Sequence, residues 1–199
     1  MNILGLVSVV LVAWSGHAAS AQQDIDKGNA AYEAGNYATA FQEFKPLAEQ
    51  GDAKAQLALG AIYLKGQGVP QNEAEALRWF KLAADQGHAF GQYALAVMYR
   101  NGYGVPQDYS EALKWLRLAA KQGEAEAQLA LGSMYEKGQG LLQDFVRAHM
   151  WYNIAVANGS DEAVRRRDAM ARALRSDDIF IAQGTARRCM ESNYKNCGW

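Results

Sequence analysis

The chain has 199 residues and a net charge of −1, with 20 basic and 21 acidic side chains. A balanced charge of this kind creates no overall field that would attract nucleic acid or an anionic membrane surface, so we expect neither as a partner. One cluster of arginines at 165–175 is interleaved with and flanked by acidic residues at 161, 162, 168, 177 and 178, which is typical of a solvated helix face.

The first 21 residues contain no charged side chain, and Ile3 to Trp14 form an apolar run. Ala19-Ser20-Ala21 then matches the A-x-A pattern of a signal-peptide cleavage site. The run is too short to cross about 30 Å of hydrocarbon as a helix. We therefore predict a signal peptide at 1–21 that is cleaved after Ala21, a periplasmic or secreted protein, and no stable membrane insertion after cleavage.

A repeat dominates the rest of the chain. Three blocks of equal length, 52–87, 88–123 and 124–159, follow one pattern, and a shorter, divergent unit at 25–51 precedes them. Such a period indicates a solenoid, because one unit cannot bury its own apolar face without a neighbour. The sequence thus predicts an all-α fold, with an α-solenoid of stacked antiparallel helix hairpins over 24–159. We expect C-terminal capping helices and a tail over 160–199.

Each block divides into two predicted helices. In the first block, one helix follows the N-cap residue Asp52 and covers about 53–65, and the second starts near Asn72. Glycines between the two permit the positive φ of a turn. Asn72 with Glu75, like Asp108 with Glu111, has the spacing of a capping box. After the blocks, we expect one helix over 161–175 and a last helix that reaches about 190.

Comparison of the three blocks separates packing positions from variable ones. Four positions hold the same residue in every block, and we expect these residues to be core, because packed interiors tolerate little change in volume. They are Gln56, Gln92 and Gln128; Leu59, Leu95 and Leu131; Tyr63, Tyr99 and Tyr135; and Trp79, Trp115 and Trp151.

Variable positions fall on one face of the first helix of each block, at spacings of three, four and three residues. In a stack of hairpins this face lines the concave side, so we predict a groove for an extended or helical peptide. Tyr93 is the best contact candidate, because its ring has a polar tip. Leu57 and Leu129 have an alternative role in packing against the next repeat. The predicted groove residues are Leu57, Ala61, Leu64, Phe90, Tyr93, Val97, Arg100, Leu129, Ser133 and Glu136.

Two cysteines, Cys189 and Cys197, stand near the end of the chain. An oxidising compartment favours their pairing, and the intervening loop is long enough to bend back, so we predict one disulfide between them. The alternative is two free thiols. Further ligands at zinc spacing are missing, so we expect no metal site.

Signals for catalysis are weak, and we expect neither catalytic residues nor a cofactor. His88 and His149 follow the predicted signal peptide, and neither has a partner at metal-ligand spacing. His149 replaces a leucine of the other blocks, and we interpret it as an interior histidine with a hydrogen bond. Ser192 and Lys195 match S-x-x-K, but the companion motifs of a penicillin-binding enzyme are missing.

The repeat motif is carried, in the first block, by Ala55-Gln56, Leu59-Gly60, Tyr63, Gly66, Gly68-Val69, Ala76, Trp79, Ala83-Ala84 and Gly87. This motif resembles that of the Sel-1-like repeat (SLR) family, which is related to tetratricopeptide repeats. The third block departs from it at Leu141-Leu142, where the others have Val-Pro. The resemblance implies an α-solenoid that acts as an adaptor or scaffold, including exported bacterial members. We therefore predict an exported, non-enzymatic protein that binds a protein or peptide in its concave groove.

The sequence leaves two other functions open. Some cysteine-rich SLR relatives are connected with penicillin binding, so the resemblance also implies, as an alternative, a cell-wall-related or β-lactam-binding hydrolase. Those relatives carry a cysteine pair in each repeat, and the repeats of this chain contain no cysteine. A purely structural spacer is the third interpretation.

Overall fold

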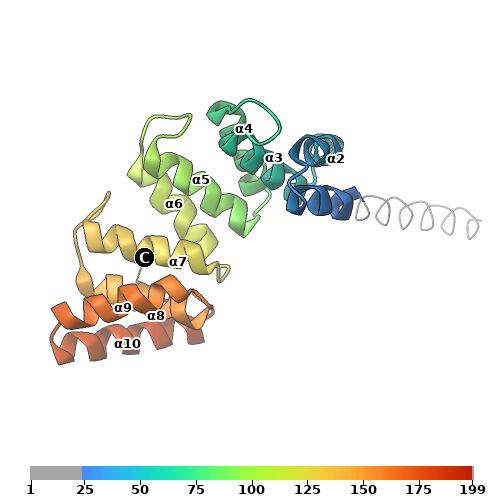
Figure 1. Ribbon diagram of the computed structural model, residues 1–199. Coiled ribbons are helices and arrows are strands. Elements are labelled where there is room, and N and C mark those ends of the chain that lie inside the picture. The colour runs from blue at the N-terminus through green and yellow to red at the C-terminus, as the bar shows by residue number, and fades with distance from the viewer. Residues whose placement is uncertain (1–23, 199) are drawn as a thin grey trace, which may run out of the picture. The chain divides into compact units, whose positions relative to one another are not determined.

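The computed structural model describes residues 24–198, and this part of the chain is built from helices and turns without a strand (Figure 1). The chain divides into two compact units, one that ends at Ala83 and one that begins at Ala84. The predicted all-α solenoid of stacked helix hairpins is confirmed. The predicted signal peptide lies outside the described residues. Within residues 24–198, no helix combines the length and the apolar character needed to cross a membrane.

A helix over 24–33 begins the described part of the first unit. It is followed by α2 (Tyr37–Glu49), α3 (Ala53–Lys65) and α4 (Glu73–Asp85), whose last two residues fall in the second unit. The second unit continues with α5 (Ala89–Asn101), α6 (Tyr109–Ala120), α7 (Ala125–Lys137), α8 (Phe145–Ala157), α9 (Asp161–Ala173) and α10 (Ser176–Glu191).

The helix boundaries follow from local capping. The Asp52 carboxylate accepts a hydrogen bond from the Ala55 N–H at 2.8 Å, and the Asn72 amide oxygen accepts one from the Glu75 N–H at 3.1 Å. Helix α3 ends at Gly66, whose φ of +66° is in the left-handed region that favours glycine. The Glu75 carboxylate binds Arg78 at 2.9 Å, and the Asn72 N–H donates to the Tyr63 carbonyl, so only the Asn72 half of the predicted capping box is formed.

A buried glutamine near the start of α3, α5 and α7 ties each of these helices to the one before it. The three side chains are at most 5% exposed, as predicted for core positions. Each donates from Nε2 to a carbonyl oxygen in the last turn of the preceding helix, where intrahelical donors run out. The pairs are Gln56 with Ala48 at 3.1 Å, Gln92 with Ala84 at 3.4 Å, and Gln128 with Ala120 at 3.1 Å.

The other constant positions are buried with one exception. The three leucines and the three tryptophans are at most 9% exposed, which confirms them as core. Among the tyrosines, Tyr135 is buried, whereas Tyr63 and Tyr99 are half-buried. The Arg147 guanidinium lies over the Tyr135 ring, 5.6 Å from its centroid, and covers the ring from solvent.

The predicted disulfide between Cys189 and Cys197 is present, with Cα atoms 4.6 Å apart, and both residues are buried. In the loop that it closes, Asn193 and Tyr194 have φ values of +50° and +60°, which residues other than glycine adopt uncommonly. This turn places the Tyr194 hydroxyl against the Asn158 amide, 2.9 Å from Nδ2 and 3.1 Å from Oδ1. The tail therefore packs on the turn that follows α8.

In two of the hairpins, a glycine on the first helix packs closely against an aromatic ring on the second helix. A Cβ atom added to Gly60 would lie 2.5 Å from Phe80 Cδ1, and one added to Gly132 would lie 2.5 Å from Tyr152 Cε1. Contacts this short are not tolerated, so the rings occupy the space that a larger residue would need.

The second block solves the same packing problem with different residues. Ala96 and Leu116 stand at the offsets of the glycine and the ring, and both are buried. A larger residue on the first helix is thus matched by a smaller one on the second. This exchange suggests that the hairpins conserve total volume rather than residue type.

We predict that Gly132→Ala lowers the free energy of unfolding by about 1–3 kcal/mol, because the added methyl group overpacks Tyr152 even though alanine favours helix formation. Chemical denaturation measures the change. Gly184→Ala in α10 is the matched control, because a Cβ there meets only Arg188 Nη1, at 3.6 Å. The control should be as stable as the native protein or more stable.

A double variant separates overpacking from other causes. Tyr152→Leu added to Gly132→Ala recreates the residue pair of the second block. The double variant should therefore lose less free energy of unfolding than the sum of the losses in the two single variants. A strictly additive loss would show that the contact between these two side chains is not responsible.

Candidate functional site

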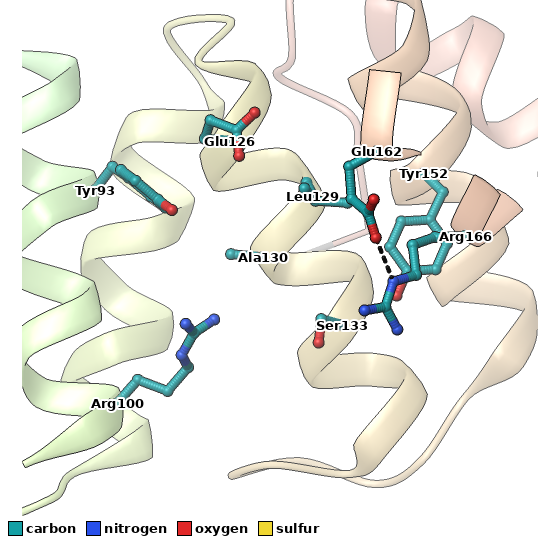
Figure 2. Close-up of a pocket in the computed structure, with 9 residues that line it drawn as sticks. All are labelled: Tyr93, Arg100, Glu126, Leu129, Ala130, Ser133, Tyr152, Glu162 and Arg166. Carbon is teal, nitrogen blue, oxygen red and sulfur yellow. Dashed lines mark hydrogen bonds and ion pairs between the residues drawn. The ribbon is translucent and has the colours of Figure 1, made fainter. Parts of the chain in front are cut away.

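A cleft of about 170 Å³ opens in the second unit. Figure 2 shows the side chains around it, which come from four helices. Four predicted groove residues line this cleft: Tyr93 and Arg100 on α5, and Leu129 and Ser133 on α7. The other lining residues are Glu126 and Ala130 on α7, Tyr152 on α8, and Glu162 and Arg166 on α9.

Three further predicted residues of the second unit lie outside the lining. Phe90 is 44% exposed and packs edge-on against the Tyr93 ring, with 5.7 Å between centroids. Glu136 accepts a hydrogen bond from the Tyr152 hydroxyl. Val97 is half-buried on α5. Phe90 and Glu136 therefore support cleft residues.

The remaining three predicted residues belong to the first unit. Leu57, Ala61 and Leu64 lie on α3 and are half-buried. None of them lines the cleft described above. Their role in partner binding stays a prediction.

The charged residues of the cleft fall into two groups. Arg166 Nε donates to Glu162 Oε1 at 3.0 Å, and this hydrogen bond, together with a second one from Arg165, holds the pKa of Glu162 below its usual value. In contrast, neither the Arg100 guanidinium nor the Glu126 carboxylate has a hydrogen-bond or ion-pair partner within residues 24–198. Figure 2 shows Arg100 on α5 and Glu126 on the neighbouring α7.

Two phenols add hydrogen-bonding capacity. Burial, and then the charge of Glu126, raises the pKa of Tyr93, so its hydroxyl is protonated at neutral pH. Burial and the hydrogen bond to Glu136 likewise raise the pKa of Tyr152. The Tyr152 hydroxyl is engaged with Glu136, but in the described part of the chain the Tyr93 hydroxyl has no hydrogen-bond partner. Tyr93 is thus available to donate to a ligand.

Sequence reasoning missed five of the lining residues. Glu126 stands at the variable offset that Phe90 occupies in the preceding block, so the repeat comparison contained its signal. Tyr152 differs from its first-block counterpart Phe80 only by a hydroxyl group, which is weak evidence without the position of Glu136. Glu162 and Arg166 come from α9, which begins and ends one repeat length after α7, so a continued period places Glu162 at the offset of Glu126. Ala130 gave no signal because it resembles an ordinary packing residue.

The histidine and serine candidates have structural roles. His149 is 1% exposed, and its Nδ1 lies 2.9 Å from the Asn153 side-chain nitrogen, which confirms an interior histidine with a hydrogen bond. Ser192 Oγ donates to the Cys189 carbonyl at 2.8 Å and accepts from the Asn196 N–H at 2.9 Å, so its hydroxyl stabilises the tail. Among residues 24–198, no group of three or more His, Cys, Asp or Glu side chains could hold a metal ion.

Comparison with known proteins gives consistent matches. The family model described as Sel1 repeat matches residues 53–88, 89–124 and 125–160. A Sel1 repeat protein from Oxalobacter formigenes is 33% identical, with a TM-score of 0.68 over 72% of this chain and 58% of the other. A protective antigen of uropathogenic Escherichia coli strains, which displays an SLR fold, is 36% identical, with a TM-score of 0.67 over 77% of this chain and 34% of the other.

A more distant likeness concerns the fold alone. Cysteine rich protein B of Helicobacter pylori is 21% identical, with a TM-score of 0.50 over 63% of this chain and 90% of the other. None of the curated proteins matches the chain. The chain spans 58% and 34% of the length of the Oxalobacter and Escherichia proteins, respectively.

Burial, followed by the charge of Arg167, lowers the pKa of His149 below its ordinary value of 6.5. The unfolded chain therefore binds a proton more readily than the folded one, so we predict that stability falls as the pH drops below about 6.5. Denaturation between about pH 5 and pH 7 measures the slope, which for one proton cannot exceed about 1.4 kcal/mol per pH unit. His149→Leu introduces the residue found at this offset in the other two blocks, and it should flatten the profile. Identical slopes for the two proteins would contradict the prediction.

Proposed function

Because the chain belongs to the Sel1 repeat family, whose proteins generally act as protein-interaction scaffolds, we propose that it is an exported scaffold that binds a protein or peptide partner in the cleft lined by α5, α7, α8 and α9. Its affinity would come from a preformed surface with a few anchoring contacts.

One observation carries the proposal: the cleft leaves three polar groups without a partner around an apolar surface. The Arg100 guanidinium, the Glu126 carboxylate and the Tyr93 hydroxyl surround Leu129 and Ala130. Groups of this kind would orient a ligand, while the apolar side chains favour burial of a hydrophobic anchor. A peptide that offers an apolar side chain between an acidic and a basic group would satisfy all of them.

Export is proposed from the sequence of the first 21 residues and is supported by the disulfide. Disulfides persist in oxidising compartments and are rare in the cytosol. The Cys189–Cys197 bond closes the loop that presents Tyr194 to Asn158. Pairing of these cysteines would therefore be completed in the compartment where the protein acts.

A non-enzymatic role is typical of the Sel1 repeat fold. The alternative of a β-lactam-binding hydrolase receives no support from these observations. Its candidate serine, Ser192, already uses its hydroxyl in two hydrogen bonds of the tail.

We predict that the double variant Tyr93→Ala with Arg100→Ala binds the partner of the native protein more weakly. Cross-linking in the cell envelope, followed by capture and mass spectrometry, identifies what the native protein binds. Titration with that purified partner should then show binding weakened by about tenfold or more, since aromatic and arginine anchors dominate interface energies.

Matched substitutions away from the cleft provide the control for this titration. Tyr103→Ala with Arg172→Ala removes the same two residue types from exposed positions. Equal thermal stability of all three proteins shows that folding is not the cause. Unchanged affinity of the cleft variant would refute the cleft as the binding site and would favour a spacer role.

We also predict that the protein isolated from the envelope begins at Gln22 and has no free thiol. Intact mass spectrometry with and without reduction checks both points, because iodoacetamide should add to Cys189 and Cys197 only after reduction. Retention of residues 1–21, or alkylation without a reductant, would contradict export through a cleaved signal peptide.

A further inference from the structure

Helix α10 has two opposite faces. Ala182, Ala186 and Cys189 are at most 2% exposed and form the face that packs on α8. Their spacing of four and three residues places them on one side of the helix. Figure 1 shows α10 at the edge of the second unit, with its other side turned away from α8.

The outer face carries a regular stripe. Asp177, Phe180, Gly184, Arg187 and Glu191 follow spacings of three, four, three and four residues, which is the spacing of a helix that pairs with another helix. Phe180 is 78% exposed, an unusual state for a large aromatic side chain on a packed helix. Most of this ring therefore faces solvent in the described part of the chain.

A hollow lies next to Phe180 on the same face. It has a volume of about 440 Å³ and is lined by Phe180, Gln183, Gly184, Arg187, Arg188 and Glu191. A Cβ added to Gly184 would meet only Arg188 Nη1, at 3.6 Å, so the glycine leaves the hollow open towards solvent. Gly184 therefore lies one turn after an exposed aromatic ring, in a recess flanked by Arg187 and Arg188, whose aliphatic stems and guanidinium groups pack well against a ring.

Charge is distributed unevenly along this face. Asp177 stands on this face in the first turn of α10, and Arg187 and Arg188 stand three turns later. The Asp177 carboxylate also lies 3.6 Å from Arg175, but both side chains are 83% exposed, and such surface pairs contribute little. An antiparallel copy of the same helix would bring each acidic end next to a basic end.

We propose that α10 is a self-association surface, on which a second copy of this chain docks antiparallel through its own α10. Phe180 of each copy enters the hollow over Gly184 of the other, and the acidic first turn of each helix faces the arginines of the other. A surface that is complementary to itself in both shape and charge fits a twofold interface. This proposal does not depend on the cleft or its partner.

The size of the surface sets the expected strength. A helix of 16 residues is about 24 Å long, so the pair lies at the low end of the area found in specific complexes. We therefore expect a reversible dimer with a dissociation constant in the micromolar range.

Sedimentation equilibrium of the purified protein over a range of concentrations tests the proposal. The native protein should dimerise, while Phe180→Ala and Gly184→Leu should each raise the dissociation constant by about tenfold or more, since one removes the ring and the other fills the recess. Leucine is a better helix former than glycine, so Gly184→Leu should keep or raise the thermal midpoint. A monomeric native protein, or dimers that persist in both variants, would overturn the proposal.

Charge reversal tests the antiparallel arrangement. The variant Asp177→Lys and the variant Arg187→Glu should each be monomeric, because like charges then meet at both ends of the helix pair. An equimolar mixture should form a heterodimer with affinity close to that of the native dimer. If both variants are folded and their mixture remains monomeric, the pairing is wrong.

Discussion

The hydrogen bond from a buried glutamine to the preceding helix fixes the spacing of the hairpins. A buried amide without partners costs about 1–3 kcal/mol, so glutamine is tolerated only where the preceding helix ends at the right place. In the third block, Gln128 donates to Ala120 and accepts from Asn158 at 2.8 Å, which also ties the turn after α8 to α7. This arrangement holds α7 in the position where Leu129 and Ser133 line the cleft.

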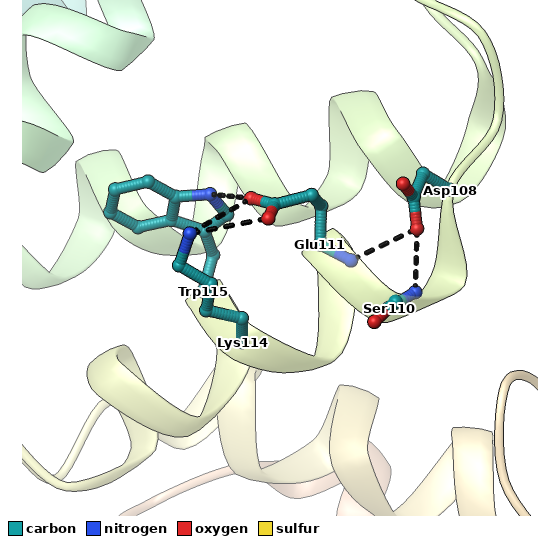
Figure 3. A network of polar contacts seen from close by, with 5 residues as sticks. All are labelled: Asp108, Ser110, Glu111, Lys114 and Trp115. Carbon is teal, nitrogen blue, oxygen red and sulfur yellow. Dashed lines mark hydrogen bonds and ion pairs between the residues drawn. The ribbon is translucent and has the colours of Figure 1, made fainter.

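The repeat allowed much of the fold to be predicted, because period, caps and constant positions all report local packing. Helix α3 covers the predicted residues, and constant glutamines, leucines and tryptophans are buried. The finer use of side chains was not readable. Asp108 caps α6 as its spacing predicts, but the Glu111 carboxylate accepts from Trp115 Nε1 at 3.1 Å and from Lys114 rather than completing the box (Figure 3). That choice depends on the position of a ring one turn away, which spacing does not encode.

For the candidate site, sequence comparison identified one wall of the cleft and missed the other. Tyr93, Arg100, Leu129 and Ser133 lie on first helices, where variation between repeats marks a free face. The opposite wall comes from α9, which begins one repeat length after α7 but lies beyond the last match to the repeat motif, so comparison of the three blocks did not reach Arg166. Family membership then supplies the general role of a scaffold, while the unpaired charges of the cleft define what a partner must offer.

The tail around Tyr194 has a consequence for the growth of this array during evolution. The Tyr194 hydroxyl is hydrogen-bonded to the Asn158 amide, and a Cβ atom added to Gly123 would lie 3.7 Å from the Tyr194 ring. A duplicated hairpin inserted between existing blocks would find matching neighbours on both sides. One added after Gly159 would have to displace a disulfide-closed loop, so insertion within the array disturbs fewer existing contacts than addition at this position.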